Sequence, residues 1–352
     1  MELELEIISR KTFNLTPKGP LLISRAPKWL RPYLKPEAYQ SMVELVTPVC
    51  ETLSEAEAFI TQSLHELEKM CQEEDTFWLA ASLHPFARAL EQKVWGKKRY
   101  LRIFEELQII GRRFIAQGLH VHLGMPDVNA ALRVYHVLRL YLPLFLALST
   151  SSPFYEAHPT GFHSYRTKLF EVLPLAGLPR SFYSWEEFES LIHLLTRLKI
   201  VEGLRDLWWD IRFQPALGTV EVRICDAPGR LSDIFAIAAL MQAMAAKYLH
   251  EKPSPGIPYE TISFGKWQAA RHGICGSMIE PISLKRKDFA TVAENLLKEL
   301  EPYAQSLGSR EYLARVGKIL ERKPISFMML ALFERGANFP EIIASMREEF
   351  WK

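Results

Sequence analysis

Four short segments of the chain alternate apolar residues with acidic or imidazole side chains. In the segment 219–226, Glu221 and Arg223 alternate with valine and isoleucine. This alternation is typical of a strand that buries one face and leaves the other polar. The other three segments contribute the remaining acidic and imidazole groups, which are Glu4 and Glu6, Glu44, and His120 with His122. We therefore expect one sheet whose polar face collects these side chains.

Carboxylates and imidazoles on one sheet face can bind divalent metal ions. Magnesium prefers oxygen ligands and commonly bridges protein carboxylates to the phosphates of a substrate. Glu4 and Glu6 would lie about 6.5–7 Å apart along their strand, and an imidazole could complete the shell of a second ion. The candidate metal ligands are Glu4, Glu6, Glu44 and Glu221, with either His120 or His122 as the imidazole; His122 is also a candidate for ATP or substrate binding. Taken singly, they have alternatives: a solvated edge strand, a salt bridge of Glu221 to Arg223, or a polar face without a ligand.

An arginine beside these acids could neutralise a phosphoryl group during its transfer. The guanidinium group keeps its charge and donates hydrogen bonds as a planar fork. Arg223 is the leading candidate, and together with Glu221 it forms the predicted catalytic pair. Arg166 and Arg271 are further candidates for contacts with phosphate or carboxylate groups. For both of them a structural ion pair is the alternative.

The composition is typical of a globular protein of the cytoplasm. The chain has 352 residues, 48% of them hydrophobic, and a formal net charge of +2. Its basic runs are short, so we expect no nucleic-acid partner. The acidic N-terminus lacks a signal pattern, and the apolar stretch 137–148 is shorter than the ~20 residues that span a bilayer, so we expect no membrane association. Four widely spaced cysteines indicate reduced thiols and no zinc site.

Several familiar motifs for nucleotide binding and hydrolysis are absent from the sequence. It contains no GxxxxGK[ST] loop, no GxGxxG after a strand, no GxSxG elbow and no HExxH pair. A nucleotide would therefore have to be bound by some means other than a P-loop or a dinucleotide-binding turn.

Strand patterns and helix patterns alternate along the chain. We expect strands at about residues 2–9, around Glu44, at 78–83, at the histidine segment and at 219–226. Helices are expected from a Ser54–Glu57 capping box to about Cys71, over 99–117, from Asp127 to Leu148, after Ser184 with Glu187, from Ser232 to near His250, and beyond Pro253. Because the strands are apolar on one face only, they favour an α+β fold, with a mainly antiparallel sheet and helices packed on one face.

These elements are expected to form a single catalytic domain over residues 1–352. Residues 1–254 would be its sheet-containing core and residues 255–352 its helical completion. Asp210 and Arg212 follow a pair of tryptophans and are expected to pair with each other. The apolar segment 234–244 could contribute to the interface of a homodimer, although packing in the core is an equal alternative.

The order of several rare strings resembles the carboxylate–amine ligases of the glutamate–cysteine ligase type 2 family. The matching segments are 40–50 (QSMVELVTPVC), 84–87 (HPFA), 118–124 (GLHVHLG), 146–154 (LALSTSSPF), 206–212 (DLWWDIR) and 218–226 (GTVEVRICD). The resemblance implies a glutamine-synthetase-like catalytic fold. In that fold a curved sheet backed by helices holds ATP and two or more magnesium ions, for which manganese could substitute.

Matched residue by residue, the resemblance assigns a role to each predicted site residue. It makes Glu4, Glu6, Glu44, His120 and Glu221 metal ligands and makes Arg223 the arginine that faces the phosphate. It also implies two small-molecule substrates besides ATP. A carboxylate, typically the γ-carboxylate of glutamate, would attack the γ-phosphate to give an acyl phosphate, and an amine such as cysteine would then displace phosphate. The alternatives are a kinase acting on a guanidino or amine group and a non-catalytic nucleotide-binding regulatory protein.

The sequence departs from the family pattern at three places. Leu5 stands between the two glutamates, Ser82-Leu83 precedes the His-Pro pair, and Gly265 stands ahead of Trp267. These changes leave the predicted metal ligands in place. They concern the identity of the substrates, because an altered side chain near a ligand changes what the site can hold.

Overall fold

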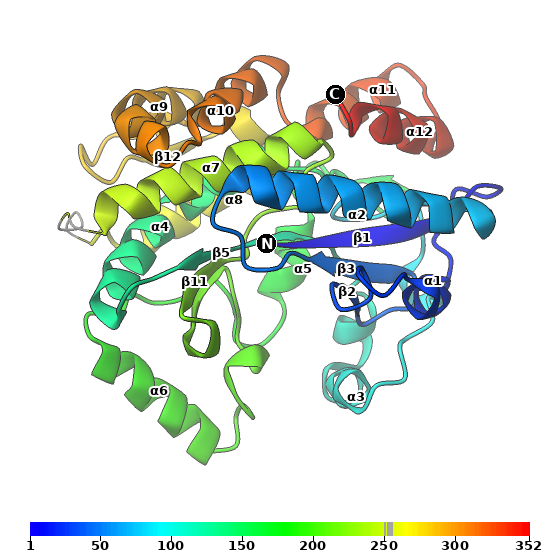
Figure 1. The fold of residues 1–352 in the computed structure, drawn as a ribbon, viewed down its shortest axis with the longest axis horizontal. Coiled ribbons are helices and arrows are strands. Elements are labelled where there is room, and N and C mark those ends of the chain that lie inside the picture. Colours follow the sequence, from blue (N-terminus) through cyan, green and yellow to red (C-terminus); the bar gives the residue numbers. More distant parts are fainter. Residues whose placement is uncertain (250, 252–255) are drawn as a thin grey trace.

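A seven-stranded sheet lies at the centre of the computed structural model, which describes residues 1–249, 251 and 256–352 (Figure 1). The sheet runs in the order β10 (Ile211–Gln214), β11 (Thr219–Val222), β5 (Leu119–Gly124), β1 (Glu2–Ser9), β3 (Met42–Val46) and β2 (Leu34–Pro36). The seventh strand, β4 (Thr76–Leu79), pairs with the second half of β1. Every pairing in this sheet is antiparallel, as the one-sided apolar pattern predicted.

The strand register brings the polar side chains of different segments opposite one another. Glu4 of β1 pairs with Glu44 of β3, and Glu2 of β1 pairs with His120 of β5. On the other side of β5, His122 pairs with Glu221 of β11. Directly opposed residues in antiparallel strands have Cβ atoms only about 5 Å apart. The sheet therefore gathers acids and imidazoles on one face.

Helices cover the other face of the sheet. α2 (Leu53–Glu73) and α7 (Leu231–Tyr248) lie along it, and α4 (Val128–Ser149) and α8 (Tyr259–His272) pack beside them (Figure 1). Beyond these helices lie α9 (Phe289–Ser306), α10 (Arg310–Arg322), α11 (Ile325–Glu334) and α12 (Phe339–Glu349). On the side of the open face lie α3 (Lys98–Arg112) and α6 (Trp185–Arg197) (Figure 1). The predicted α+β fold, with helices on one face of an antiparallel sheet, is confirmed.

The remaining elements are short and connect the layers. They are α1 (Gly19–Arg25), α5 (Arg166–Glu171), the pairs β6 (Phe154–Tyr155) with β7 (His158–Pro159), β8 (Ala176–Gly177) with β9 (Trp208–Trp209) and β12 (Ser277–Ile279) with β13 (Arg286–Asp288), and the 3₁₀ turns η1 (Ala89–Glu91), η2 (Leu204–Asp206), η3 (Pro215–Leu217) and η4 (Gly273–Cys275). The β12–β13 hairpin interrupts the helical region that the sequence predicted after Pro253. The predicted boundary at residues 254 and 255, and the helix end near His250, lie outside or at the edge of the described residues.

Two helix starts were predicted correctly, and a third was misplaced. Asp127 accepts a hydrogen bond from the backbone of Ala130, and Ser184 accepts one from Glu187, as the sequence predicted for α4 and α6. The cap of α2 is Thr52, whose side chain accepts from Glu55, so the predicted Ser54–Glu57 capping box is wrong. Glu57 instead reaches α10, where Tyr312 and Arg315 donate to it at 2.8 Å each.

Three other predicted elements end earlier than expected. The strand predicted at 78–83 ends at Leu79, and the strand predicted at 219–226 ends at Val222. The helix predicted over 99–117 ends at Arg112 and is interrupted at Gln108, whose φ is 49°. The apolar pattern continues past each end because the following loops are buried too. Burial alone does not distinguish a strand from a buried loop.

α4 is the described helix that is long and apolar enough to cross a membrane. It has 22 residues and contains the stretch 137–148, but 89% of its apolar window is buried inside the protein. α7 is buried in the same way, because Ile234 and Met244 are both fully covered. The segment 234–244 therefore packs in the core, and the suggestion that it forms a dimer interface is wrong.

Candidate active site

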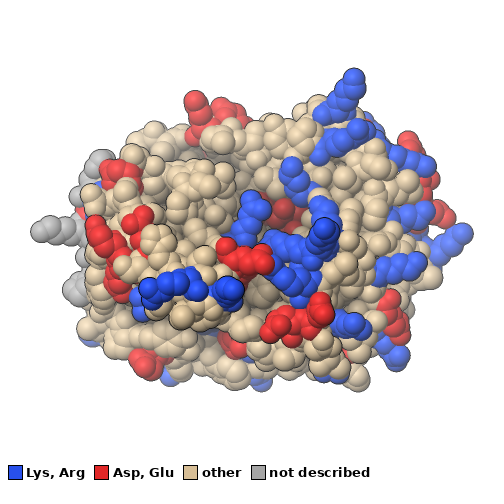
Figure 2. Space-filling model, turned by 90° about the horizontal axis from the view of Figure 1, so that it is seen from below, with Lys and Arg blue, Asp and Glu red and all other residues tan. Residues whose placement is uncertain are grey.

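A cleft of about 1440 Å³ opens on the polar face of the sheet. Its floor contains Glu2, Glu4, Glu44, His120, His122, Arg212, Gln214 and Arg223. Glu37 adjoins Glu4 and Glu44 on the floor, and the rim includes Lys35, Lys98, Arg99, Arg102, Glu202, Arg205 and Asp206. Seen from below, basic and acidic side chains crowd together in the middle of this surface (Figure 2). The cleft is thus lined by charges of both signs, with most of the acids on the floor.

Three overlapping groups of side chains in the cleft could each hold a metal ion. In each group the candidate ligand atoms lie within 4.8 Å of one another. The groups are Glu2 with Glu44 and His120, Glu4 with Glu37 and Glu44, and Glu2 with His122 and Glu221. They combine side chains from β1, β3, β5 and β11 with one from the turn between β2 and β3. Oxygen-rich groups of this kind suit a hard divalent cation.

The group of three carboxylates shows an excess of negative charge. Burial, together with the carboxylate of Glu4, raises the pKa of Glu37 to about 8. Burial and the carboxylates of Glu37, Glu2 and Glu4 also raise the pKa of Glu44 well above its usual range. Like charges this close favour neutralisation by a proton or by a bound cation. The donor set therefore fits a divalent metal ion.

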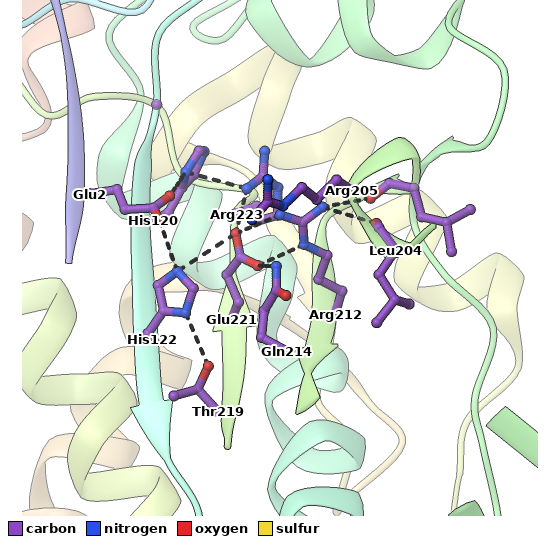
Figure 3. A network of polar contacts seen from close by, with 12 residues as sticks. Glu2, His120, His122, Leu204, Arg205, Arg212, Gln214, Thr219, Glu221 and Arg223 are labelled. Atoms are coloured by element: carbon purple, nitrogen blue, oxygen red, sulfur yellow. Dashed lines mark hydrogen bonds and ion pairs between the residues drawn. The ribbon is translucent and has the colours of Figure 1, made fainter. Parts of the chain in front are cut away.

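Glu2 connects the two histidines of β5 (Figure 3). His120 Nδ1 lies 2.8 Å from one of its carboxylate oxygens, and His122 Nε2 lies 3.2 Å from the other. Burial acts to raise the pKa of Glu2, but the hydrogen bonds to His120 and His122 outweigh it and lower the pKa. Burial and the charge of Arg223 lower the pKa of His120. A neutral imidazole is the form that can coordinate a metal.

Glu221 is buried among hydrogen-bond donors, next to Glu2 and His122 of the cleft lining (Figure 3). Arg212 Nε donates to it at 2.6 Å and Gln214 Nε2 at 2.8 Å, and Arg223 donates to its other oxygen. Burial acts to raise the pKa of Glu221, but the charges of Arg223 and Arg212 outweigh it and lower the pKa. The salt bridge to Arg223 that the sequence offered as an alternative is therefore present. The same carboxylate also belongs to one of the three metal groups.

The predicted pair between Asp210 and Arg212 is wrong. Arg212 projects to the polar face because it pairs across the strands with Glu221. Asp210, one residue before β10, points away and accepts a hydrogen bond from Lys266 of α8 at 2.7 Å. Residues 210 and 212 would share a face of a regular strand, which suggested the contact. β10 begins only at Ile211, so Asp210 lies outside the strand and pairs with Lys266 instead.

Three of the predicted site residues are not brought into the metal groups or the cleft lining. Glu6 is fully buried opposite Met42 and Leu79, and burial raises its pKa. Arg166 is 2% exposed and donates to backbone carbonyls beneath the floor. Arg271 is exposed on α8, where its guanidinium lies 5.9 Å from the ring centre of Phe162. The structure brings together Glu4, Glu44, His120, His122, Glu221 and Arg223.

The structure also adds site residues that the sequence analysis did not assign. Glu2 stands two positions before Glu4 on the same strand, so the alternation that identified Glu4 could have found it. Arg212 stands opposite Glu221, and strand pairing was needed to find it. Glu37 lies between β2 and β3, outside any periodic pattern. For that residue the sequence carries no signal.

The family model described as "Glutamate-cysteine ligase family 2" matches residues 23–326 of the chain. The chain belongs to this family. A member from Gloeobacter violaceus, named "Putative glutamate--cysteine ligase 2", is 38% identical over 356 residues, which cover 98% of this chain and 95% of that protein. The predicted family resemblance is therefore confirmed. It places the chain among ligases.

Two solved structures share the fold of this family member. A glutamate–cysteine ligase from Francisella tularensis, crystallised in complex with AMP, matches with a TM-score of 0.70 at 15% identity, over 99% of this chain and 88% of that one. A bifunctional glutathione synthetase from Pasteurella multocida matches with a TM-score of 0.71 at 16% identity. The match covers 99% of this chain but only 51% of the Pasteurella protein. At these sequence identities, the structural similarity shows that the proteins share a fold.

Proposed function

We propose that the protein is an ATP-dependent carboxylate–amine ligase that joins a carboxylate, the γ-carboxylate of glutamate, to an amine. The observation that carries this proposal is the convergence of three metal-competent groups beside Arg223 in one cleft. Membership of the family supports ligase chemistry. The bound AMP of the Francisella relative supports ATP as the nucleotide.

The floor of the cleft would hold the metal ions and the transferred phosphoryl group. Glu2, Glu4, Glu37, Glu44 and His120 provide the ligands of the first two groups. Bound magnesium would supply positive charge against the oxygens of the triphosphate. Arg223 would donate to the γ-phosphoryl oxygens, and its contact with Glu221 fixes the position of its guanidinium group. His122 and Glu221 form the third group together with Glu2 and are proposed to complete the site.

The rim would bind the anionic parts of the substrates. Among the described residues, Lys35, Lys98 and Arg205 line the cleft without a side-chain ion pair, so their charges are free to meet phosphate or carboxylate groups. In the proposed reaction, a carboxylate oxygen attacks the γ-phosphorus and ADP leaves. The amine nitrogen then attacks the acyl carbon, expels inorganic phosphate and loses a proton. Cysteine is one candidate amine.

We also propose the cellular location, the domain organisation, the partners and the alternative metal ion that the sequence analysis predicted. We place the enzyme in the cytoplasm, as a single catalytic unit over residues 1–352 that acts on small molecules and binds neither nucleic acid nor membranes. The four cysteines are free, which agrees with a reducing compartment. Manganese is expected to replace magnesium, because it also accepts oxygen and imidazole ligands.

A panel of amines tests this proposal. The protein would be incubated with glutamate, ATP, magnesium and each amine, and the products would be read by mass spectrometry. We expect ADP and a γ-glutamyl amide, whereas a stable phosphorylated acceptor would indicate a kinase. Arg223→Lys should slow ADP formation by at least about a hundredfold, because a point charge cannot replace the guanidinium fork. Arg197→Lys, on the exposed end of α6, is the matched control and should leave the rate unchanged.

A further inference from the structure

Arg166 is a buried cation whose charge the proposed reaction does not use. It is 2% exposed, and its guanidinium lies 4.6 Å from the ring centre of Phe170. Its backbone amide donates to Ser152 Oγ at 3.2 Å, and the same hydroxyl donates to Asp226. Its side chain makes no ion pair with a carboxylate in the described part of the chain. Burying a charge is costly, so the groups that receive its hydrogen bonds are informative.

Both terminal nitrogens of Arg166 donate to the backbone that carries Arg223. Nη2 donates to the carbonyl of Arg223 at 3.3 Å, and Nη1 donates to the carbonyl of Ile224 at 3.2 Å. On the other side, the amides of Arg223 and Ile224 donate to the carbonyl of Asp210 at 2.8 and 3.1 Å. β11 ends at Val222, so regular pairing no longer holds this segment. The side chain of Arg166 and the carbonyl of Asp210 supply hydrogen bonds that paired strands would otherwise supply to residues 223 and 224.

Gly118 leaves the space that the guanidinium of Arg166 occupies. A Cβ atom at this position would lie 3.0 Å from Arg166 Cζ and closer still to Nη2. It would also lie 3.1 Å from the carbonyl oxygen of Cys225. Gly118 has no positive φ, so its role here is to provide space and not an unusual backbone conformation.

The same glycine contacts the acidic side of the cleft. Its amide donates to Glu4 Oε2 at 2.6 Å, and its carbonyl accepts from the amide of Glu4 at 3.1 Å. Glu4 belongs to the group of three carboxylates that fits a metal ion. Arg166 and Gly118 therefore form one buried support beneath both Arg223 and Glu4.

We propose that Arg166 is a positioning residue that sets the direction of the Arg223 side chain through the carbonyls of residues 223 and 224, and that Gly118 is required to admit it. A small rotation of this peptide would be amplified at the guanidinium of Arg223, which stands at the end of a long side chain. Misplacing a reacting group by about 1 Å can cost about a hundredfold in rate. This inference rests on the proposed function, because it assigns Arg223 to the phosphate.

A double-mutant cycle between Gly118→Ala and Arg166→Met tests the proposal. The probe is β,γ-imido-ATP with magnesium, whose affinity is measured by calorimetry, and thermal unfolding is followed alongside. Each single variant should weaken binding by about tenfold or more, because each removes the support of the 223–224 peptide. The double variant should bind within about twofold of Arg166→Met, because the added methyl group has then lost the guanidinium that it displaces. Arg166→Lys, which keeps a donor, should recover part of the affinity.

Matched controls separate positioning from a general loss of structure. Gly124→Ala adds a methyl group at the last residue of β5, the strand that begins directly after Gly118. A Cβ there meets nothing within 4 Å, so this variant should bind the probe normally. Arg139→Met removes another arginine that is 2% exposed and donates to a backbone carbonyl, and it should lower the unfolding temperature but not the affinity. Additive losses in the cycle, or normal binding in Gly118→Ala, would overturn the inference alone. A wild-type protein that does not bind the probe would overturn the proposed function as well.

Discussion

At the scale of single residues, the cleft combines a local excess of negative charge with a nearby excess of positive charge. Glu4, Glu37 and Glu44 approach one another without a basic partner in their own group. Glu221, by contrast, accepts hydrogen bonds from two arginines. The charge of Arg223 acts to lower the pKa of Glu37 and of Glu44, but burial and the neighbouring carboxylates outweigh it. The acidic group is thereby left able to bind a cation, and Arg223 is held where an anion can approach.

Glu37→Gln should have opposite effects with and without magnesium. Without metal, the substitution removes a carboxyl group whose ionisation is opposed by burial and by its acidic neighbours. We therefore expect the free energy of unfolding to rise by about 1 kcal/mol at pH 8. With saturating magnesium, the wild-type protein should gain more stability than the variant, because at a given concentration a ligand that binds the folded state more tightly stabilises it more. Urea unfolding with and without magnesium measures both effects. Glu189→Gln, on exposed α6, is the control, and a variant that is less stable without metal would contradict the crowding argument.

His84 should make the protein sensitive to acid. Its Nε2 lies 2.9 Å from the carbonyl oxygen of Phe13, and its Nδ1 accepts from the amide of Ala87 at 2.9 Å. Burial lowers the pKa of His84 from 6.5 to about 3, so the unfolded chain takes up a proton that the folded protein excludes. The stabilising effect is complete above pH 6.5 and is lost as the pH falls. Between pH 6.5 and 5 it should cost about 2 kcal/mol.

The variant His84→Gln isolates this contribution from those of other histidines. We expect it to be less stable than the wild type at pH 7.5, because the buried hydrogen bonds change. Its free energy of unfolding should nevertheless fall less steeply as the pH is lowered to 5, because it has no imidazole to protonate. The control is His193→Gln on the exposed face of α6. Parallel pH curves for His84→Gln and wild type would show that His84 is not held neutral.

At the scale of elements, the mouth of the cleft is bridged by α3 and η2. Arg102 of α3 forms an ion pair with Glu202 and lies 3.9 Å from Asp206. Arg99, also on α3, donates to the carbonyl of Arg205 at 2.9 Å. These side chains are largely exposed, so each pair should add only about 0.2–1 kcal/mol to stability. We therefore expect these pairs to set the width of the mouth and to contribute little to the free energy of unfolding.

Charge reversal across the mouth should affect substrate binding and be rescued by a second reversal. Arg102→Glu and Glu202→Arg each place like charges opposite one another, so each should raise the KM for magnesium-ATP several-fold. The double variant restores attraction and should return the KM to near the wild-type value. If only the positive potential of the rim mattered, Glu202→Arg alone would lower the KM. Steady-state kinetics and unfolding temperatures of the three variants distinguish these cases.

The elements also show what could be predicted from the sequence. Alternation along β1, β3, β5 and β11 predicted the polar face, because a strand repeats every two residues whatever its neighbours. Local hydrogen bonding predicted the caps at Asp127 and Ser184. The contact of Arg212 with Glu221 depends on the pairing of β10 with β11, and Glu37 enters the site from a turn. Arg166 was singled out as a cation, but only the folded backbone shows that it serves the carbonyls of residues 223 and 224.

At the scale of the whole molecule, one continuous core joins the sheet to the helices that follow residue 255. The largest cluster of buried apolar side chains extends from Leu3 to Phe350. α7 contacts α2, α4 and β5, and it also contacts α9 and α10. Polar contacts cross the same boundary, since Glu57 of α2 accepts from Arg315 of α10. An independent C-terminal module would leave the outer side of α7 exposed.

A single core predicts a single unfolding transition, and Leu240 of α7 offers a test. Its side chain is fully buried between the two regions, so Leu240→Ala should cost about 2–5 kcal/mol of unfolding free energy. Tryptophan fluorescence and far-ultraviolet circular dichroism should report the same shifted midpoint, because unfolding of either region exposes α7. Leu198→Ala, where the side chain is 56% exposed, should leave the midpoint unchanged. Separate transitions for the two signals would divide the chain into two domains and would require the cleft to be stable without the helices behind it.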